Sequence, residues 1–307
     1  MRSGPLVQHS QTPTHTVTNR PSRYAQTFDY DHRFHAANAG DVLKHCVLLG
    51  WLDALLKGEE QWVLLDTHAG AGMFNLPAQG EWLQGIGRLD TSDLSAAPPL
   101  VQRYMKAVGD KRKPGRGGLY PGSPALSRKR LRSQDRLILC ERAEAPYSKL
   151  AAHYKDDTSV TVIEGDGLTQ LVDKAENLQN QRLAAVIDPP YVSKAEWTAV
   201  ADAVVNAHRL RTDLCTFLWF PIKSLTRPRA VIAAFRKAGL PGVNVELVHT
   251  PLRLQRKRLN GSGIILLNPP DGFAATLAEP LLWLGQVLST EGEWNMTTLV
   301  WRGAAAT

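Results

Sequence analysis

Apolar positions along the chain follow two spacings, one typical of helices and one typical of buried strands. Between residues 41 and 57 apolar side chains recur three or four positions apart, which predicts an amphipathic helix. Asp41 is the candidate N-cap of this helix, and Gly58 is its candidate stop. A short, continuous apolar run follows at residues 62–66 and predicts a buried strand.

Further apolar runs rich in β-branched residues follow, and helical patterns lie between many of them. The runs occupy residues 137–140, 160–163, 184–187, 215–220, 243–248, 264–267 and 298–301. Alternating strands and helices are typical of a mostly parallel sheet that is covered by helices on both faces. We therefore predict an α/β domain at residues 28–307, built on a mostly parallel sheet.

Two segments break this alternation. Residues 1–27 are polar, lack Asp and Glu and show no periodicity, so we predict a disordered N-terminal tail. Residues 76–121 are interrupted by glycines and prolines and contain a basic, glycine-rich stretch at 111–118. We interpret this second segment as a small, partly helical subdomain inserted into the domain.

Composition narrows the setting in which the chain works. Hydrophobic residues make up 43% of it, enough for a sizeable core, yet no apolar run reaches the roughly 18 residues of a membrane span. Three cysteines lie far apart without a CxxC pair, so we predict buried thiols, no metal site and a reducing, cytoplasmic location. The formal net charge of +7 favours a polyanionic partner, although many basic proteins bind no nucleic acid.

A glycine-containing motif, DxxxGxG, follows the first strand at residues 66–72. Glycine allows the backbone to approach a ligand closely, and nucleotide-like cofactors bind at the ends of such strands. A dinucleotide site needs a third glycine, which is missing after Gly72. Asp66 instead fits the ammonium group of S-adenosyl-L-methionine, so we predict that Asp66, Gly70 and Gly72 bind this cofactor and its product S-adenosyl-L-homocysteine. A simple tight turn is the alternative.

Two further acidic residues are expected at the same edge of the sheet. Glu141 ends the second strand, where an acid accepts hydrogen bonds from ribose hydroxyls, usually about 20 residues after the glycines. The longer interval here matches the size of the predicted insertion. Asp166 follows the third strand and can hold the adenine amine of the cofactor. Each acid alone also fits ordinary polarity at a strand end.

The motif Asp-Pro-Pro-Tyr follows the fourth strand at residues 188–191. The exocyclic amine of a base is a poor nucleophile because its lone pair is delocalised into the ring. The Asp188 carboxylate and the Pro189 carbonyl can each accept one N–H, and the two prolines hold that carbonyl rigidly. Tyr191 offers a face on which a flipped base can stack. We predict these three residues as catalytic, with a structural turn as the alternative; the similar Asn-Pro-Pro-Asp at 268–271 we interpret as such a turn.

Three basic runs, at 106–116, 128–136 and 253–258, are candidates for nucleic-acid contact, although such runs commonly form solvated faces. The third run precedes a strand, on a connection expected to flank the site. We therefore predict that its four cations contact phosphates. These are Arg253, Arg256, Lys257 and Arg258.

Beyond these motifs, longer stretches of the chain resemble the RlmJ family of bacterial 23S rRNA adenine-N6 methyltransferases. The matching stretches are residues 30–45 (YDHRFHAANAGDVLKH), 65–72 (LDTHAGAG), 120–124 (YPGSP), 166–167 (DG) and 187–191 (IDPPY). The order of elements also agrees from about residue 30 to residue 301. The tail, residues 39–40 and residues 73–74 depart from the family pattern, which affects RNA contact more than cofactor binding.

The resemblance implies a Rossmann-like class I methyltransferase domain, with a mostly parallel seven-stranded sheet and a small inserted helical subdomain. The implied target is one adenine in helix 72 of 23S rRNA. It implies Asp188 as the catalytic residue and Tyr30 near the substrate adenine. Cofactor contacts are implied at Lys44, His45, His68, Ser123, Glu141, Asp166 and Gly167. From the residues alone, Lys44 and His45 share one helix face, where a solvated or core role is an alternative, and Ser123 is a candidate N-cap.

Other functions stay open as alternatives. A DNA adenine-N6 methyltransferase would share the Asp-Pro-Pro-Tyr motif, but no separate DNA-recognition domain is evident. A catalytically silent RNA-binding assembly protein would not need an intact Asp188 together with the glycine motif. A nicotinamide-dependent oxidoreductase would need the missing glycine. We expect a monomer that uses no metal and binds 23S rRNA.

Overall fold

The computed structural model describes residues 32–109, 112–113, 115–178, 181–254, 259–290 and 292–303. All of them belong to one compact unit, His32–Thr307. The predicted tail at residues 1–27 lies outside the described residues. The same holds for four predicted RNA-contacting residues, which are Tyr30, Arg256, Lys257 and Arg258.

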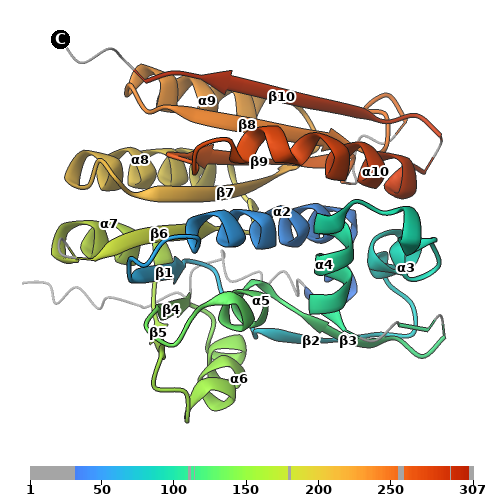
Figure 1. Ribbon diagram of the computed structural model, residues 1–307, viewed down its shortest axis with the longest axis horizontal. Coiled ribbons are helices and arrows are strands. Elements are labelled where there is room, and N and C mark those ends of the chain that lie inside the picture. The colour runs from blue at the N-terminus through green and yellow to red at the C-terminus, as the bar shows by residue number, and fades with distance from the viewer. Residues whose placement is uncertain are drawn as a thin grey trace, which may run out of the picture. The chain divides into compact units, whose positions relative to one another are not determined.

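A sheet of eight strands forms the centre of the described part of the chain, in the order β10-β8-β9-β7-β6-β1-β4-β5 (Figure 1). Its parallel strands are β1 (Trp62–Asp66), β4 (Arg136–Glu141), β5 (Val160–Glu164), β6 (Arg182–Ile187) and β7 (Cys215–Ile222). The antiparallel pairs join β9 (Gly261–Leu267) to β7, β8 (Gly242–Val248) to β9, and β10 (Asn295–Trp301) to β8. The sheet is mostly parallel, as predicted. It has eight strands rather than the seven of the family fold, and each of the eight apolar runs in the sequence lies in one of them, including the run at 298–301 in β10, which pairs with β8 along its whole length.

Helices cover both faces of the sheet, as the continuous apolar runs predicted. One face packs against α2 (Ala39–Leu55), α5 (Ser123–Arg130), α6 (Glu144–Tyr154) and α10 (Ala278–Leu288). The other face packs against α7 (Gly167–Asn177), α8 (Lys194–Leu210) and α9 (Thr226–Lys237). Alternate β1 side chains enter the two cores, so all five residues of this strand are buried. None of the helices in the described ranges is long and apolar enough to cross a membrane.

The first long helix begins earlier than the sequence indicated. The N-cap of α2 is Asn38, whose side chain accepts a hydrogen bond from the Asp41 backbone N–H at 3.0 Å. Asp41 therefore lies in the first turn, where its Oδ2 accepts from the Ala37 N–H at 2.8 Å. The reciprocal pair of bonds satisfies two backbone donors at the helix start. The predicted cap at Asp41 was wrong by three residues, because a carboxylate in the first turn satisfies the same class of donor.

The insertion contains a strand ribbon as well as helices. Strand β2 (Met73–Leu76) pairs antiparallel with β3 (Gly118–Pro121), so the chain leaves and returns at one place. Between them lie η1 (Glu81–Gln84), α3 (Ile86–Asp90), η2 (Leu94–Ala96) and α4 (Pro99–Val108). The ribbon was not predicted, because four-residue strands are too short to show a period.

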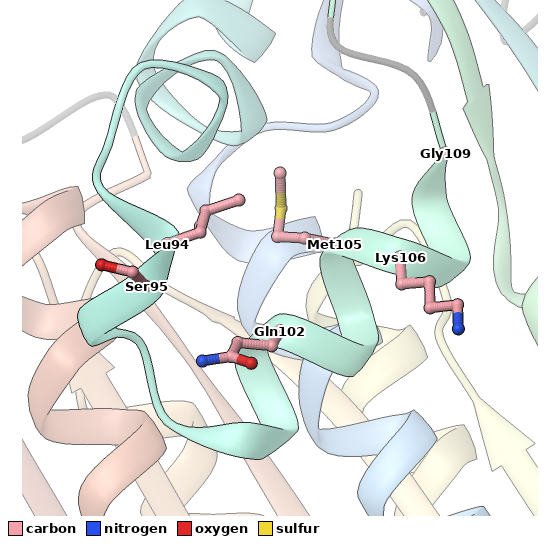
Figure 2. A pocket seen from close by; sticks show the side chains of 6 residues that line it. All are labelled: Leu94, Ser95, Gln102, Met105, Lys106 and Gly109. Carbon is pink, nitrogen blue, oxygen red and sulfur yellow. The ribbon is translucent and has the colours of Figure 1, made fainter.

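The insertion contains a buried ion pair and an open hollow. Arg112 contacts both carboxylate oxygens of Asp90, at 3.0 and 2.9 Å, and the two side chains are almost fully buried. A hollow of about 460 Å³ lies between η2 and α4, where Leu94 and Met105 face each other (Figure 2). Lys106, the first residue of the basic run at 106–116, lines this hollow, but no predicted catalytic or cofactor-binding residue does.

Candidate active site

The acidic residues that the sequence singled out lie along one edge of the sheet. Asp66 ends β1 and Glu141 ends β4, while Asp166 and Asp188 closely follow β5 and β6. These four strands are neighbours in the sheet and run parallel, so their carboxyl ends meet at the same edge. The structure therefore brings the four predicted acids together, although they are spread over more than a third of the sequence.

The glycine motif forms a loop that lies close to the neighbouring strand. Gly70 and Gly72 have φ values of +60° and +75°, in the left-handed region that favours glycine. The Gly70 N–H donates to Glu141 Oε2 at 2.9 Å, and the Ala143 N–H donates to Glu141 Oε1 at 2.7 Å. Glu141 thus braces the loop as well as standing where a ribose is expected.

The chain does not enter a helix after these glycines, as a strand-to-helix turn would require. It enters β2, and the helix that normally follows such a loop is α5, which begins after the insertion at Ser123. The Gly122 N–H donates to the Gly72 carbonyl at 2.8 Å, so the loop and the helix start are rejoined in space. The insertion therefore interrupts the unit between its loop and its helix.

Asp66 is fully buried and joins the two halves of this interrupted unit. Its Oδ2 accepts from the Ser123 hydroxyl at 2.7 Å, and its Oδ1 accepts from the His68 N–H at 3.2 Å. Burial raises the pKa of Asp66 to about 6, and the hydrogen bond from Ser123 offsets only part of that rise. Ser123 is not an N-cap, since Gly122 holds that position without a side-chain bond. It instead ties the start of α5 to the end of β1.

His68 has a defined tautomer. The Thr67 hydroxyl donates to the Val186 carbonyl at 3.1 Å and lies 2.8 Å from His68 Nδ1. Because a carbonyl can only accept, the hydroxyl gives it its one proton and accepts from Nδ1–H. Burial lowers the pKa of His68, so the ring is neutral near pH 7 and its Nε2 is an acceptor.

The start of α7 packs directly against the backbone that follows β1. Asp166 is the N-cap of α7, and its Oδ1 accepts from the Thr169 N–H at 2.8 Å. A Cβ at Gly167 would lie 1.9 Å from the Thr67 carbonyl oxygen, so no side chain fits there. Asp166 and Gly167 thus fix the third strand end against the first.

Asp188 makes a buried ion pair that the sequence did not reveal. Lys44 Nζ lies 2.5 Å from Asp188 Oδ2 and 2.7 Å from Asp41 Oδ1. It also lies 5.5 Å from the centre of the Trp219 ring, within cation–π range. Burial lowers the pKa of Lys44, but the two carboxylates raise it by more, so Lys44 stays charged. Only the spacing of Asp41 and Lys44, one helical turn apart, hinted at part of this cluster.

Tyr191 adopts a strained backbone conformation beside Asp188. Its φ of +51° is rare for a residue with a side chain and costs on the order of 1–3 kcal/mol. The Tyr191 hydroxyl donates to the Trp219 carbonyl at 3.0 Å, and its ring centre lies 4.1 Å from that of Trp197. These contacts fix the Tyr191 ring. The next residue, Val192, is 74% exposed.

Cations near the site differ in whether they are paired. Arg253 is exposed, and its guanidinium contacts Glu293 at 2.7 Å, which neutralises much of its charge. Lys223 directly follows β7, the neighbour of β6, and Lys194 begins α8 after the Asp-Pro-Pro-Tyr motif. Both are exposed and form no ion pair with other described residues. Among the described residues, no group of three or more His, Cys, Asp or Glu is arranged to hold a metal ion.

Comparisons with known proteins agree over most of the chain. The family described as "Ribosomal RNA large subunit methyltransferase D, RlmJ" matches residues 59–302. Two proteins named "Ribosomal RNA large subunit methyltransferase J" are similar to it. The one from Escherichia coli (strain K12) is 31% identical over 274 residues, covering 87% of this chain and 96% of the relative. The one from Haemophilus influenzae is 33% identical over 280 residues, with the same coverage.

A solved structure shares the fold. The crystal structure of protein LPL1258 from Legionella pneumophila superposes with a TM-score of 0.77 at 27% sequence identity. It covers 88% of this chain and 99% of that one. The fold over most of the chain is therefore one that this other protein also adopts.

Proposed function

Because the chain belongs to the RlmJ family of ribosomal RNA large-subunit methyltransferases, we propose that it methylates 23S ribosomal RNA. The proposed reaction transfers the methyl group of S-adenosyl-L-methionine to the exocyclic N6 of one adenine, in helix 72. The observation that carries this proposal is the position of Asp188 and Pro189 at the same sheet edge as the loop of Gly70 and Gly72. We propose that the protein acts as a monomer in the cytoplasm.

The residues at this edge fit the proposed cofactor. Gly70 and Gly72, both in the left-handed region, have no side chains that would block a ligand. Glu141 is the proposed acceptor for the ribose hydroxyls, and Asp166 for the adenine amine. Around the amino-acid end, His68 Nε2 supplies an acceptor, and Ser123 is anchored by Asp66. When bound, S-adenosyl-L-methionine supplies an electrophilic methyl group.

Asp188 has one carboxylate oxygen to offer to a substrate. Lys44 contacts Oδ2, whereas Oδ1 forms no hydrogen bond with other described residues. In the proposed mechanism, Oδ1 accepts one N–H of the adenine amine and the Pro189 carbonyl accepts the other. The two acceptors direct the nitrogen lone pair out of the ring plane, and preorganised acceptors of this kind cost no reorganisation during reaction. Once the amine nitrogen has taken the methyl group, with S-adenosyl-L-homocysteine as the leaving group, it loses one proton, and Asp188 Oδ1 is the proposed acceptor of that proton.

Tyr191 has a supporting role in this mechanism. Its ring is fixed by Trp197 on one side and by its hydroxyl bond to Trp219. We propose that this fixed ring stacks with the flipped adenine, which needs no further ordering of the side chain when RNA binds. Exposed cations at the same edge, such as Lys194 and Lys223, are proposed to contact phosphates together with the run at 253–258.

A methyl-transfer assay tests the function. The purified protein is given labelled S-adenosyl-L-methionine with either a 23S rRNA transcript or duplex DNA, and the product nucleosides are separated. We expect label on N6-methyladenosine from the RNA. We also expect Asp188→Asn, which removes the charge at nearly constant shape, to reduce the rate at least a hundredfold, on the order of one lost electrostatic contact.

A matched variant controls for damage to the fold. Asp271→Asn alters the exposed acid of the similar Asn-Pro-Pro-Asp turn and should leave the rate unchanged. Label on DNA in preference to RNA would favour a DNA methyltransferase. RNA binding without any transfer by the wild-type protein would favour a silent assembly factor. Either result rejects the proposal.

A further inference from the structure

Three buried polar groups form a hydrogen-bonded chain that connects the insertion to the first long helix. The hydroxyl of Tyr104 in α4 lies 3.0 Å from the hydroxyl of Tyr120 in β3. The Tyr120 hydroxyl lies 2.8 Å from Nδ1 of His45 in α2. Both tyrosines are fully buried, and His45 is 2% exposed. Each proton in this chain therefore needs a partner within the protein.

The direction of the chain follows from counting donors and acceptors. Among the described residues, the hydroxyl of Tyr104 has Tyr120 as its hydrogen-bond partner and no other. Burial raises the pKa of both tyrosines well above the usual range, so each hydroxyl keeps its proton. If Tyr120 donated to Tyr104, the Tyr104 proton would be buried without an acceptor, which is costly. Tyr104 must therefore donate to Tyr120, and Tyr120 must donate to His45 Nδ1.

A ring nitrogen that accepts a hydrogen bond carries no proton, so His45 in this arrangement is the neutral tautomer with its proton on Nε2. The second tyrosine strengthens the assignment, because a hydroxyl that accepts one hydrogen bond becomes a better donor in the next. The insertion thus selects which kind of hydrogen bond this histidine can form.

The position of the chain links it to the cofactor edge. Tyr120 directly precedes the segment Pro121–Ser123, in which Gly122 bonds to Gly72 and Ser123 bonds to Asp66. On α2, the residue before His45 is Lys44, which contacts Asp188. His45 is therefore bonded to a residue two positions before Gly122 and is next in sequence to the lysine that contacts Asp188.

We propose that Tyr120, supported by Tyr104, is a positioning residue that fixes His45 as an Nε2–H donor for the carboxylate of the cofactor's amino-acid end. This inference rests on the proposed function, since it takes S-adenosyl-L-methionine as the ligand. It gives the insertion a part in cofactor recognition, through two tyrosines that do not touch the ligand. The His68 acceptor complements this donor, because the same end of the cofactor carries an ammonium group as well as a carboxylate.

Two ligands that differ only in that end provide the binding test. S-adenosyl-L-homocysteine carries the amino-acid end, and 5′-methylthioadenosine lacks it while keeping the adenosine and the thioether. We expect Tyr120→Phe to weaken S-adenosyl-L-homocysteine binding about tenfold, as for one lost or misdirected bond to a charged group. Binding of 5′-methylthioadenosine should change less than about twofold. Tyr104→Phe should have the same pattern with a smaller effect, because Tyr120 can still donate to His45.

Nitrogen NMR of histidine-labelled protein tests the tautomer directly. The His45 resonances are assigned by their loss in a His45→Gln variant. We expect an unprotonated Nδ1 and a protonated Nε2 in the wild type, and a mixture of tautomers in Tyr120→Phe. Tyr147→Phe is the matched control, since the hydroxyl of this half-buried tyrosine in α6 makes no hydrogen bond with other described residues.

The outcomes separate this inference from the function on which it rests. A protonated Nδ1 in the wild type overturns the inference, as does an equal loss of both ligands in Tyr120→Phe. Unchanged S-adenosyl-L-homocysteine affinity in that variant overturns it as well, and the proposed function then stands. If the wild-type protein binds neither ligand, the proposed function itself fails.

Discussion

Replacing Lys44 by methionine should destabilise the protein strongly, and a second substitution should reverse part of that loss. Lys44 is buried between Asp188 and Asp41, whose side chains are 15% and 13% exposed. Lys44→Met keeps most of the side-chain volume and removes the cation that both carboxylates contact. Breaking a buried ion pair from one side costs about 3–5 kcal/mol.

Removing the charge at Asp188 as well should recover part of this cost. Asp188→Asn alone leaves Lys44 paired with Asp41, and we expect it to cost about 1–2 kcal/mol as a weakened buried contact. In the double variant, fewer unpaired charges remain buried. Its total cost should therefore be at least about 1 kcal/mol below the sum of the single costs, a coupling typical of residues in contact.

Urea unfolding followed by circular dichroism at pH 7 measures these free energies. For a domain of this size, a loss of about 3 kcal/mol corresponds to a fall in Tm of roughly 6–12 °C. Lys155→Met is the control, because Lys155 is 73% exposed and lies 3.9 Å from Asp156; it should change stability very little. Costs of Lys44→Met and Asp188→Asn that add within about 0.5 kcal/mol would refute the coupling inferred from the structure.

Three further predictions concern the start of α7, the buried acid Asp66 and the exposed cations proposed to contact RNA. Gly167→Ala should abolish cofactor binding or unfold the site, because the new Cβ would lie 1.9 Å from a backbone oxygen. In Gly165→Ala the nearest atom to the new Cβ lies 3.9 Å away, so this control should bind the cofactor normally in calorimetry. Burial raises the pKa of Asp66 to about 6, so the stabilising contribution of the protonated acid is present at low pH and is lost as pH rises through 6. Compared with Asp66→Asn in urea titrations, the wild type should lose about 3 kcal/mol of unfolding free energy between pH 4 and pH 7. A difference between the two proteins that stays constant with pH would contradict this. Lys223→Gln should lower the slope of log RNA affinity against log salt concentration by about 0.9. Arg253→Gln should lower this slope by less, because Arg253 is already paired with Glu293. Equal slopes for the two variants would be the contrary result.

The positions of the acids could be predicted because each one marks the end of a strand. A run such as residues 184–187 is apolar on both faces, so its end is visible in the sequence, and parallel strands place their ends together. The turn at Asn268 also follows an apolar run, but the strand direction places it at a different edge of the sheet. Strand β9 runs antiparallel to β7, so its end lies at the other edge of the sheet. There the Asn268 side chain donates to the Thr212 and Leu214 carbonyls, in keeping with the structural turn that was predicted.

Contacts between distant segments could not be predicted in the same way. The partner of Asp188 is Lys44, 144 positions away, and nothing in a single sequence records which lysine reaches which carboxylate. The hydrogen-bonded chain from Tyr104 through Tyr120 to His45 was not predicted for a related reason. Tyr120 belongs to a stretch that the family resemblance marked, but its hydroxyl has a role only once β3 lies beside α2. The ribbon that positions it has strands too short to leave a pattern.

The closing of the ribbon also orders events during folding. The bond between Gly72 and Gly122 joins the two ends of a long excursion of the chain, and its closure costs about 3 kcal/mol of chain entropy, estimated from the logarithm of its length. Local helices and strand pairs that are close in sequence, such as β4 with β5, can form before that cost is met, whereas the contact between the glycine loop and the start of α5 cannot. During refolding, cofactor binding should accordingly appear more slowly than helical circular dichroism. The delay between the two measures how long the insertion takes to dock.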